Sequence, residues 1–62
     1  MNLERGKMYG FYKYGKIHFK FVFIKKIFDG KFCSRLLYYN LLKNKIMTGL
    51  FFNEEIVAVV KK

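Results

Sequence analysis

The segment Lys16–Phe23 reads K-I-H-F-K-F-V-F and has the clearest structural pattern in the chain. Apolar side chains alternate there with Lys and His, and this period of two is typical of a β-strand with one buried face. In a helix the same apolar residues would spread around the cylinder. We expect a strand that begins at Lys16 and continues toward Phe28. Its predicted core residues are Ile17, Phe19, Phe21 and Phe23, and Lys16, His18 and Lys20 share the opposite face.

Glycine-containing turns flank this strand. Asp29-Gly30 predicts a hairpin with a type I′ turn, in which both central residues have positive φ. Tyr14-Gly15 predicts another turn on the other side. Gly10 lies inside an aromatic segment and predicts a bulge or a sharp bend. Small barrels use such bent, glycine-marked strands to close.

The segment from 32 to 45 fits two interpretations. One is a strand over 32–40 followed by a loop over 41–45, which Tyr38-Tyr39 favours because aromatic side chains are frequent in strands. The other is a helix that Ser34 caps and that carries Leu37, Leu41 and Leu42. We expect the strand.

The last part of the chain is also open to two interpretations. Residues 46–52 predict a short strand, and Asn53-Glu54-Glu55 predicts a turn or the start of a helix. The β-branched segment 56–60 favours a strand. A short helix capped by Asn53 is the alternative, because two Glu residues at its start and two Lys residues at its end suit the helix dipole.

These elements predict a mainly β fold with four or five short antiparallel strands. We expect a small antiparallel barrel or curled sheet of the SH3-like or OB-like kind, with or without one short helix. The alternative is a four-stranded sheet with a short terminal helix that dimerises. The length of 62 residues predicts a single small basic domain over residues 1–62.

The composition argues against several classes of protein. One cysteine, Cys33, forms no internal disulfide, and with one histidine it supplies too few ligands for the common zinc sites. We expect no metal and no cofactor. Nucleophilic catalysis needs a nucleophile, a nearby base and a group that orients the base. Cys33 and His18 are the only pair that could supply the first two, and acids that could orient the base are scarce, so we expect no enzyme. No uncharged run approaches the ~20 residues of a transmembrane helix. Charged residues interrupt the start of the chain as well, so we expect a cytoplasmic location.

The net charge of +9 is concentrated in one part of the chain. Residues 1–45 contain eleven Lys and Arg residues against two acids, whereas residues 46–62 contain two of each. Such a positive field predicts a polyanionic partner: nucleic acid, an acidic protein surface or anionic lipid.

Basic and aromatic residues alternate along the first two predicted strands. If Met8 points inward, Tyr9, Phe11 and Lys13 lie on the outer face beside His18. Aromatic rings flanked by cations are what single-stranded nucleic-acid-binding proteins require. The alternative is that these rings complete the core. The candidate nucleic-acid-binding residues are Tyr9, Phe11, Lys13, Lys16, His18, Lys20, Lys25 and Lys26.

The segments Gly6-Lys7-Met8, Phe19-x-Phe21-x-Phe23-Ile24 and Asp29-Gly30 loosely resemble the opening of a cold-shock domain. The tail Phe52-Asn53-Glu54-Glu55-Ile56-Val57 is similar to the entry of that family's fourth strand. The resemblance implies a five-stranded OB barrel that binds single-stranded RNA or DNA on surface aromatic residues. Lys16-Ile17-His18-Phe19-Lys20-Phe21 stands near the place of the family's K-G-F-G-F-[IV] box, and its Phe-Val-His box is absent. No binding residue is therefore carried over from the family.

These observations predict a small basic protein that binds nucleic acid, either RNA or a single strand, as one component of a ribonucleoprotein assembly. The alternative is a small virus- or plasmid-encoded interaction protein that binds and inhibits a host protein, because exposed aromatic residues also suit a docking surface. A third hypothesis is association with the surface of an anionic membrane. A chain of this size gains stability from a partner, which is nucleic acid, another protein or a second copy.

Overall fold

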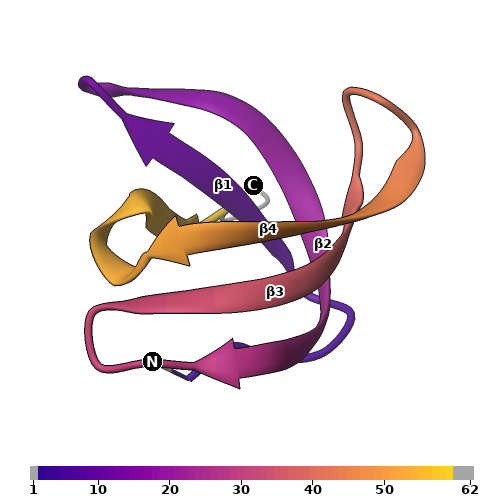
Figure 1. The fold of residues 1–62 in the computed structure, drawn as a ribbon. Coiled ribbons are helices and arrows are strands. Elements are labelled where there is room, and N and C mark those ends of the chain that lie inside the picture. Colours follow the sequence, from indigo (N-terminus) through magenta and orange to yellow (C-terminus); the bar gives the residue numbers. More distant parts are fainter. Residues whose placement is uncertain (1, 60–62) are drawn as a thin grey trace.

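The computed structural model describes residues 2–59, and five antiparallel strands form one sheet in the order β4-β3-β2-β1-β5 (Figure 1). The prediction of a mainly β fold is confirmed. The edge strands β4 and β5 do not pair with each other, so the sheet is curled and is not closed into a barrel. The elements are β1 (Met8–Lys13), β2 (Lys16–Asp29), β3 (Cys33–Asn40), β4 (Lys45–Phe52), the 3₁₀ turn η1 (Asn53–Glu55) and β5 (Ile56–Ala58).

The long strand β2 makes the sheet curl. It pairs with β1 through its first half and with β3 through its second half. Register shifts leave His18, Ile24 and Ile27 without an opposite residue. Each such bulge bends the strand and increases its twist. The sheet therefore folds over its own inner face, and β4 crosses in front of β1 in Figure 1.

Aromatic rings fill the space inside the curl. Phe21 and Leu36 are completely buried, and the Phe11 and Phe51 rings, 5.6 Å apart between centroids, connect β1 with β4 across the fold. The predicted core positions Phe21 and Phe23 are confirmed, and Phe19 packs against the core. The buried core consists of Tyr9, Phe21, Phe23, Leu36, Tyr38 and Phe51.

The prediction that Ile17 lies in the core is wrong. The register shift between Phe11 and Tyr12 leaves His18 unpaired and moves Ile17 to the outer face, where it is 42% exposed. A Cβ atom on Gly10 would lie 3.0 Å from the Ile17 side chain, so the glycine makes room for it. The bulge expected at Gly10 is therefore found on the neighbouring strand, at His18, and Gly10 itself pairs regularly with Lys20.

The two predicted turns differ in kind. Tyr14 and Gly15 have φ values of 54° and 78°, as a type I′ turn requires. Asp29-Gly30 does precede a hairpin, but the type I′ prediction is wrong because neither residue has positive φ. The Gly30 N–H donates to the Cys33 carbonyl oxygen at 2.9 Å across the turn. Glycine is needed there because a Cβ atom would lie 2.6 Å from that oxygen.

The ambiguous segments are strands in the described residues. The strand over 33–40 and the turn over 41–44 confirm one interpretation, and the helix capped by Ser34 is wrong. The Asn40 Oδ1 atom accepts the N–H groups of Leu42 and Lys43 and so holds that turn. The helix predicted as an alternative after Asn53 is also wrong, since η1 lasts three residues and β5 follows. Val60 of that segment lies outside the described residues.

Candidate nucleic-acid interface

The rings of Tyr9 and Phe11 point inward, so the prediction that they lie on the outer face is wrong. Tyr9 is 6% exposed, and its hydroxyl accepts a hydrogen bond from the Glu4 N–H at 2.8 Å. The Phe11 ring stacks against Phe19 at 5.2 Å. Met8 and Gly10 take the outer positions of β1 instead. Neither ring is presented to a nucleic-acid base.

Three of the predicted cationic residues gather at the β1–β2 hairpin. The Lys13 Nζ atom lies 3.3 Å from Glu55 Oε2, and Lys16 is directly opposite Lys13. The Nε2 atom of His18 is 2.9 Å from the carbonyl oxygen of Lys13. Because of the bulge at His18, Lys16 and Lys20 lie on opposite faces of the sheet. The predicted row of cations on one face is therefore not assembled.

The bulge at Ile24 separates the adjacent residues Lys25 and Lys26. Lys25 is opposite Leu37 on the outer face and is exposed. Lys26 is opposite the buried Leu36, and its Nζ atom donates to Asp29 Oδ2 at 3.1 Å. Lys25, like Lys20, is therefore an exposed cation on the outer face, whereas Lys26 is held at the margin of the inner face.

The outer face beside the β2–β3 turn carries exposed aromatic residues that are not among the predicted binding residues. Phe28 of β2, Arg35 of β3 and Leu50 of β4 form one row across three strands. Phe52 lies in the next row, and Phe32 projects from the turn. Phe28 is 57% exposed, Phe52 is 52% exposed and Phe32 is 72% exposed. We call this surface the hairpin face; it comprises Lys25, Phe28, Lys31, Phe32, Arg35, Leu50 and Phe52.

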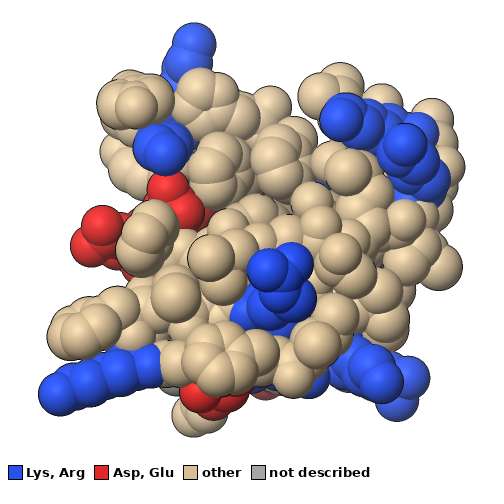
Figure 2. Space-filling model, viewed as in Figure 1, with Lys and Arg blue, Asp and Glu red and all other residues tan. Residues whose placement is uncertain are grey.

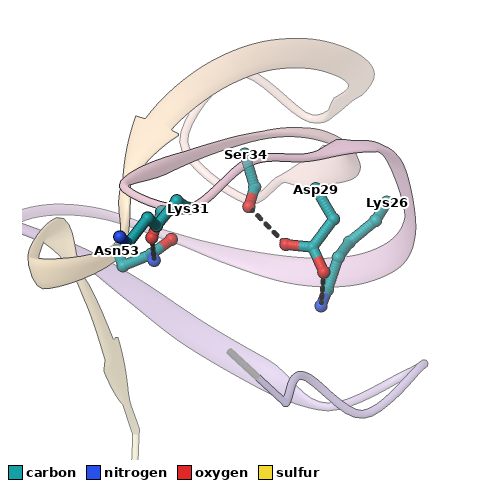
Figure 3. Close-up of polar contacts among 5 residues, drawn as sticks. All are labelled: Lys26, Asp29, Lys31, Ser34 and Asn53. Carbon is teal, nitrogen blue, oxygen red and sulfur yellow. Dashed lines mark hydrogen bonds and ion pairs between the residues drawn. The ribbon is translucent and has the colours of Figure 1, made fainter.

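A polar network on the inner side supports the base of this hairpin (Figure 3). The Ser34 hydroxyl donates to Asp29 Oδ1 at 3.0 Å, while Lys26 binds the other carboxylate oxygen. The hydrogen bonds from Lys26 and then from Ser34 lower the pKa of Asp29. The carboxylate is therefore neutralised on the side away from the hairpin face.

The tip of the hairpin is fixed by the start of η1. The Asn53 Nδ2 atom donates to the Lys31 carbonyl oxygen at 3.1 Å (Figure 3). The Asn53 N–H donates to the Phe32 carbonyl oxygen at 3.0 Å. The Lys31 Nζ atom lies 5.6 Å from the centroid of the Phe32 ring. A cation and an aromatic ring are thus presented together from an anchored turn.

The outer strand positions of β2, β3 and β4 contain no acidic residue. Figure 2 shows a largely tan surface with separate blue groups, most of them at its margins, and with red atoms at two places on its rim. Three of the four acids form ion pairs away from the outer positions, and the fourth, Glu54, is exposed in η1, two residues after Phe52. These pairs are Glu4 with Lys7, Glu55 with Lys13, and Asp29 with Lys26.

Sequence reasoning missed the hairpin face for a definite reason. Extended from Lys16 with a strict period of two, the alternation assigns Lys25 to the inner face, but the bulge at Ile24 moves it to the outer face, and the second bulge at Ile27 returns Phe28 to the face that the alternation assigns to it. The available signal was Lys31-Phe32 directly after Asp29-Gly30, because a large aromatic residue in a hairpin turn is left in solvent.

No family model, curated protein or solved structure matches the chain. Among residues 2–59, no group of three His, Cys, Asp or Glu side chains is arranged to hold a metal ion. The same part of the chain has no pocket and no helix long and apolar enough to cross a membrane. The hairpin face is therefore an open surface from which side chains protrude.

Proposed function

We propose that this protein binds single-stranded nucleic acid, RNA or DNA, through the hairpin face. The observation that supports this function is the set of three exposed phenylalanine rings interspersed with Lys25, Lys31 and Arg35, together with outer strand positions of β2, β3 and β4 that contain no acid. Bases of a single strand stack on exposed rings, whereas the bases of a duplex are already stacked on one another.

The expected affinity has two sources. Each base that stacks on a ring contributes about 1–3 kcal/mol. Each phosphate neutralised by a cation adds about −0.7 to the slope of log K against log salt for a single strand. Three engaged cations therefore give a slope near −2, and replacing one of them with alanine reduces its magnitude by about 0.7.

The proposal includes an SH3-like arrangement in preference to an OB-like barrel. Consecutive hairpins join β1 to β4, and a short 3₁₀ turn leads into β5, which returns to β1. We also place the protein in the cytoplasm as one component of a ribonucleoprotein assembly. The unpaired Cys33 supports this location, because cytosolic thiols stay reduced.

The test uses fluorescence anisotropy with labelled oligo-dT, oligo-U and a duplex of equal length, each titrated at several salt concentrations. Phe32→Ala is compared with Tyr14→Ala, a matched control at the opposite end of β2. Both rings are highly exposed, and each has a lysine about equally close: Lys31 at 5.6 Å from Phe32 and Lys13 at 5.5 Å from Tyr14.

The expected result is that Phe32→Ala weakens single-strand binding about tenfold, the loss of one stacked base, while Tyr14→Ala leaves it unchanged. The reverse result would move the interface to the β1–β2 hairpin. An absence of binding to every oligonucleotide at low salt and micromolar protein would remove the nucleic-acid function.

A second candidate function is the docking of a protein partner, whose inhibition would be the biological effect. The observation that favours it is that Ile27, Leu42 and Ile46 are aliphatic and more than half exposed, and aliphatic side chains do not stack on bases. Capture of one defined partner that survives nuclease treatment, together with no response to oligonucleotides, would establish this alternative.

A further inference from the structure

Strand β4 is an open edge of the sheet. It is eight residues long, and β3 is the one strand of the described residues that pairs with it. An edge strand directs half of its backbone N–H and C=O groups away from the sheet, where another strand can bind them.

The hydrogen-bond pattern identifies which groups of β4 face outward. The Asn53 N–H donates to Phe32, whereas the Phe52 N–H donates to the Glu55 side chain at 3.0 Å and not to β3. Hydrogen-bonded and non-hydrogen-bonded pairs alternate along an antiparallel ladder. The backbone groups of Ile46, Thr48 and Leu50 therefore point toward the open edge, and the side chains of these residues lie on the outer face.

After Lys45 at its start, nothing in the sequence of β4 discourages pairing. Residues 46–52 contain no charged residue and no proline, the two devices that commonly block edge pairing. The opposite edge differs, because β5 is three residues long and offers little to a partner strand. The sheet thus has one protected edge and one edge that is ready to pair.

We propose that β4 pairs antiparallel with β4 of a second copy of this chain, about a two-fold axis through Thr48, independently of nucleic acid. In this register Ile46 lies opposite Leu50 of the second copy, and Thr48 lies opposite its own counterpart. All three outward-facing residues then form hydrogen-bonded pairs, each with Cα atoms about 5.5 Å apart. The strand is self-complementary in this register.

The side chains agree with the same register. Ile46 and Leu50 are exposed aliphatic residues that become cross-strand neighbours on the outer face. The axis also brings the turn over 41–44 toward the Asn53-Glu54 segment of the second copy. Lys43 lies in this turn, Lys45 follows it directly, and Glu54 is exposed. The charges at the ends of the paired strands are therefore of opposite sign.

The pairing has a geometric consequence for the hairpin faces. A two-fold axis perpendicular to the joined sheet leaves both outer faces on the same side. The two copies of Phe52 are then eight strand positions apart, or about 26 Å. A dimer presents two hairpin faces to one ligand strand.

Analytical ultracentrifugation without nucleic acid tests the proposal. Thr48→Lys places like charges directly opposite each other and is expected to weaken dimerisation about tenfold or more. Thr48→Val is the matched control and should dimerise normally. Mixing Thr48→Lys with Thr48→Glu should restore a dimer that neither variant forms alone. A wild-type chain that stays monomeric at 100 μM, or a Thr48→Lys variant that dimerises like Thr48→Val, overturns the proposal.

Cross-linking tests the register separately. In a Cys33→Ser background, Thr48→Cys should form an intermolecular disulfide under mild oxidation, because a Cα separation of about 5.5 Å suits that bond. Leu50→Cys is the control and should cross-link far more slowly, since Ile46 of the second copy lies opposite. Equal rates for the two variants contradict the register. These experiments contain no oligonucleotide, so their failure is distinct from failure of the proposed function.

Discussion

Lys13 of β1 and Glu55 of η1 form an ion pair, with 3.3 Å between Nζ and Oε2, and the Glu55 side chain is 11% exposed. The second carboxylate oxygen of Glu55 accepts the Phe52 N–H at 3.0 Å. Lys13 thus connects the first strand to the turn before the last one. This contact explains its position without reference to any ligand.

Replacement of Lys13 with alanine should therefore affect stability more than binding. We expect Lys13→Ala to lower the free energy of unfolding by about 1–2 kcal/mol, because the mostly buried Glu55 loses its partner. Urea denaturation measures this loss. Oligonucleotide affinity of the folded variant should stay within twofold of wild type. Lys43→Ala, in an exposed turn, is the control and should change stability little.

The hydrogen bond from Ser34 to Asp29 should make stability depend on pH in the acid range. The pKa of Asp29 is lowered in the folded protein, first by Lys26 and then by Ser34. Its contribution is therefore complete above the usual aspartate pKa of about 3.9 and is lost as pH falls through the lower folded value. Ser34→Ala should raise the pKa of Asp29, and carboxyl NMR titration measures that shift. The stability difference from wild type should shrink below pH 3; a constant difference would contradict this mechanism.

Tyr38 should make the stability of the protein depend on pH in the alkaline range. Burial raises the pKa of Tyr38, and a hydrogen bond with Asn40 opposes this to a smaller extent. Its contribution to stability is complete below the unfolded value near 10 and is lost as pH rises through the higher folded value. Tyr38→Phe should reduce the loss of stability above pH 10, measured by urea denaturation. Tyr14→Phe, at an exposed position, should leave the alkaline profile unchanged.

The β1–β2 turn offers a route to higher stability. Tyr14 has a φ of 54°, which costs a side chain of this kind about 1 kcal/mol, whereas Asn adopts it readily. Tyr14→Asn should raise the free energy of unfolding by about 0.5–1 kcal/mol, with part of the gain offset by the lost contact between Tyr14 and His18. Gly15→Ala should have the opposite effect. Thermal unfolding of the two variants in parallel checks both directions.

Local pattern predicted the elements well because it depends on local physics. The alternation from Lys16 to Phe23 predicted β2, and Tyr14-Gly15 predicted the first hairpin. Side-chain direction depends on register instead, and a shift of one residue moves every following side chain to the other face. The bulges at His18, Ile24 and Ile27 make such shifts, and no residue type at those positions marks them.

The location of the candidate site also depends on strand register, which the sequence pattern does not reveal. We expected rings and cations to gather on one face of the first two strands, whereas the structure presents exposed rings and cations beside the β2–β3 turn. Tyr9 and Phe11 point into the core because the small domain uses its rings to fill the interior. Phe28, Phe32 and Phe52 come together only when the sheet pairs β2, β3 and β4 in register, which the sequence pattern does not reveal.

The pairing of β1 with β5 has a consequence for how the chain folds. Tyr9 lies opposite Ala58, so residues near the two ends of the described chain must meet, whereas the other strand pairs form from neighbouring hairpins. Closing a long loop costs more entropy than closing a short one. We expect the four-stranded meander to form first and β5 to dock last. During synthesis on the ribosome, β1 therefore has an open edge until the last strand has left the exit tunnel.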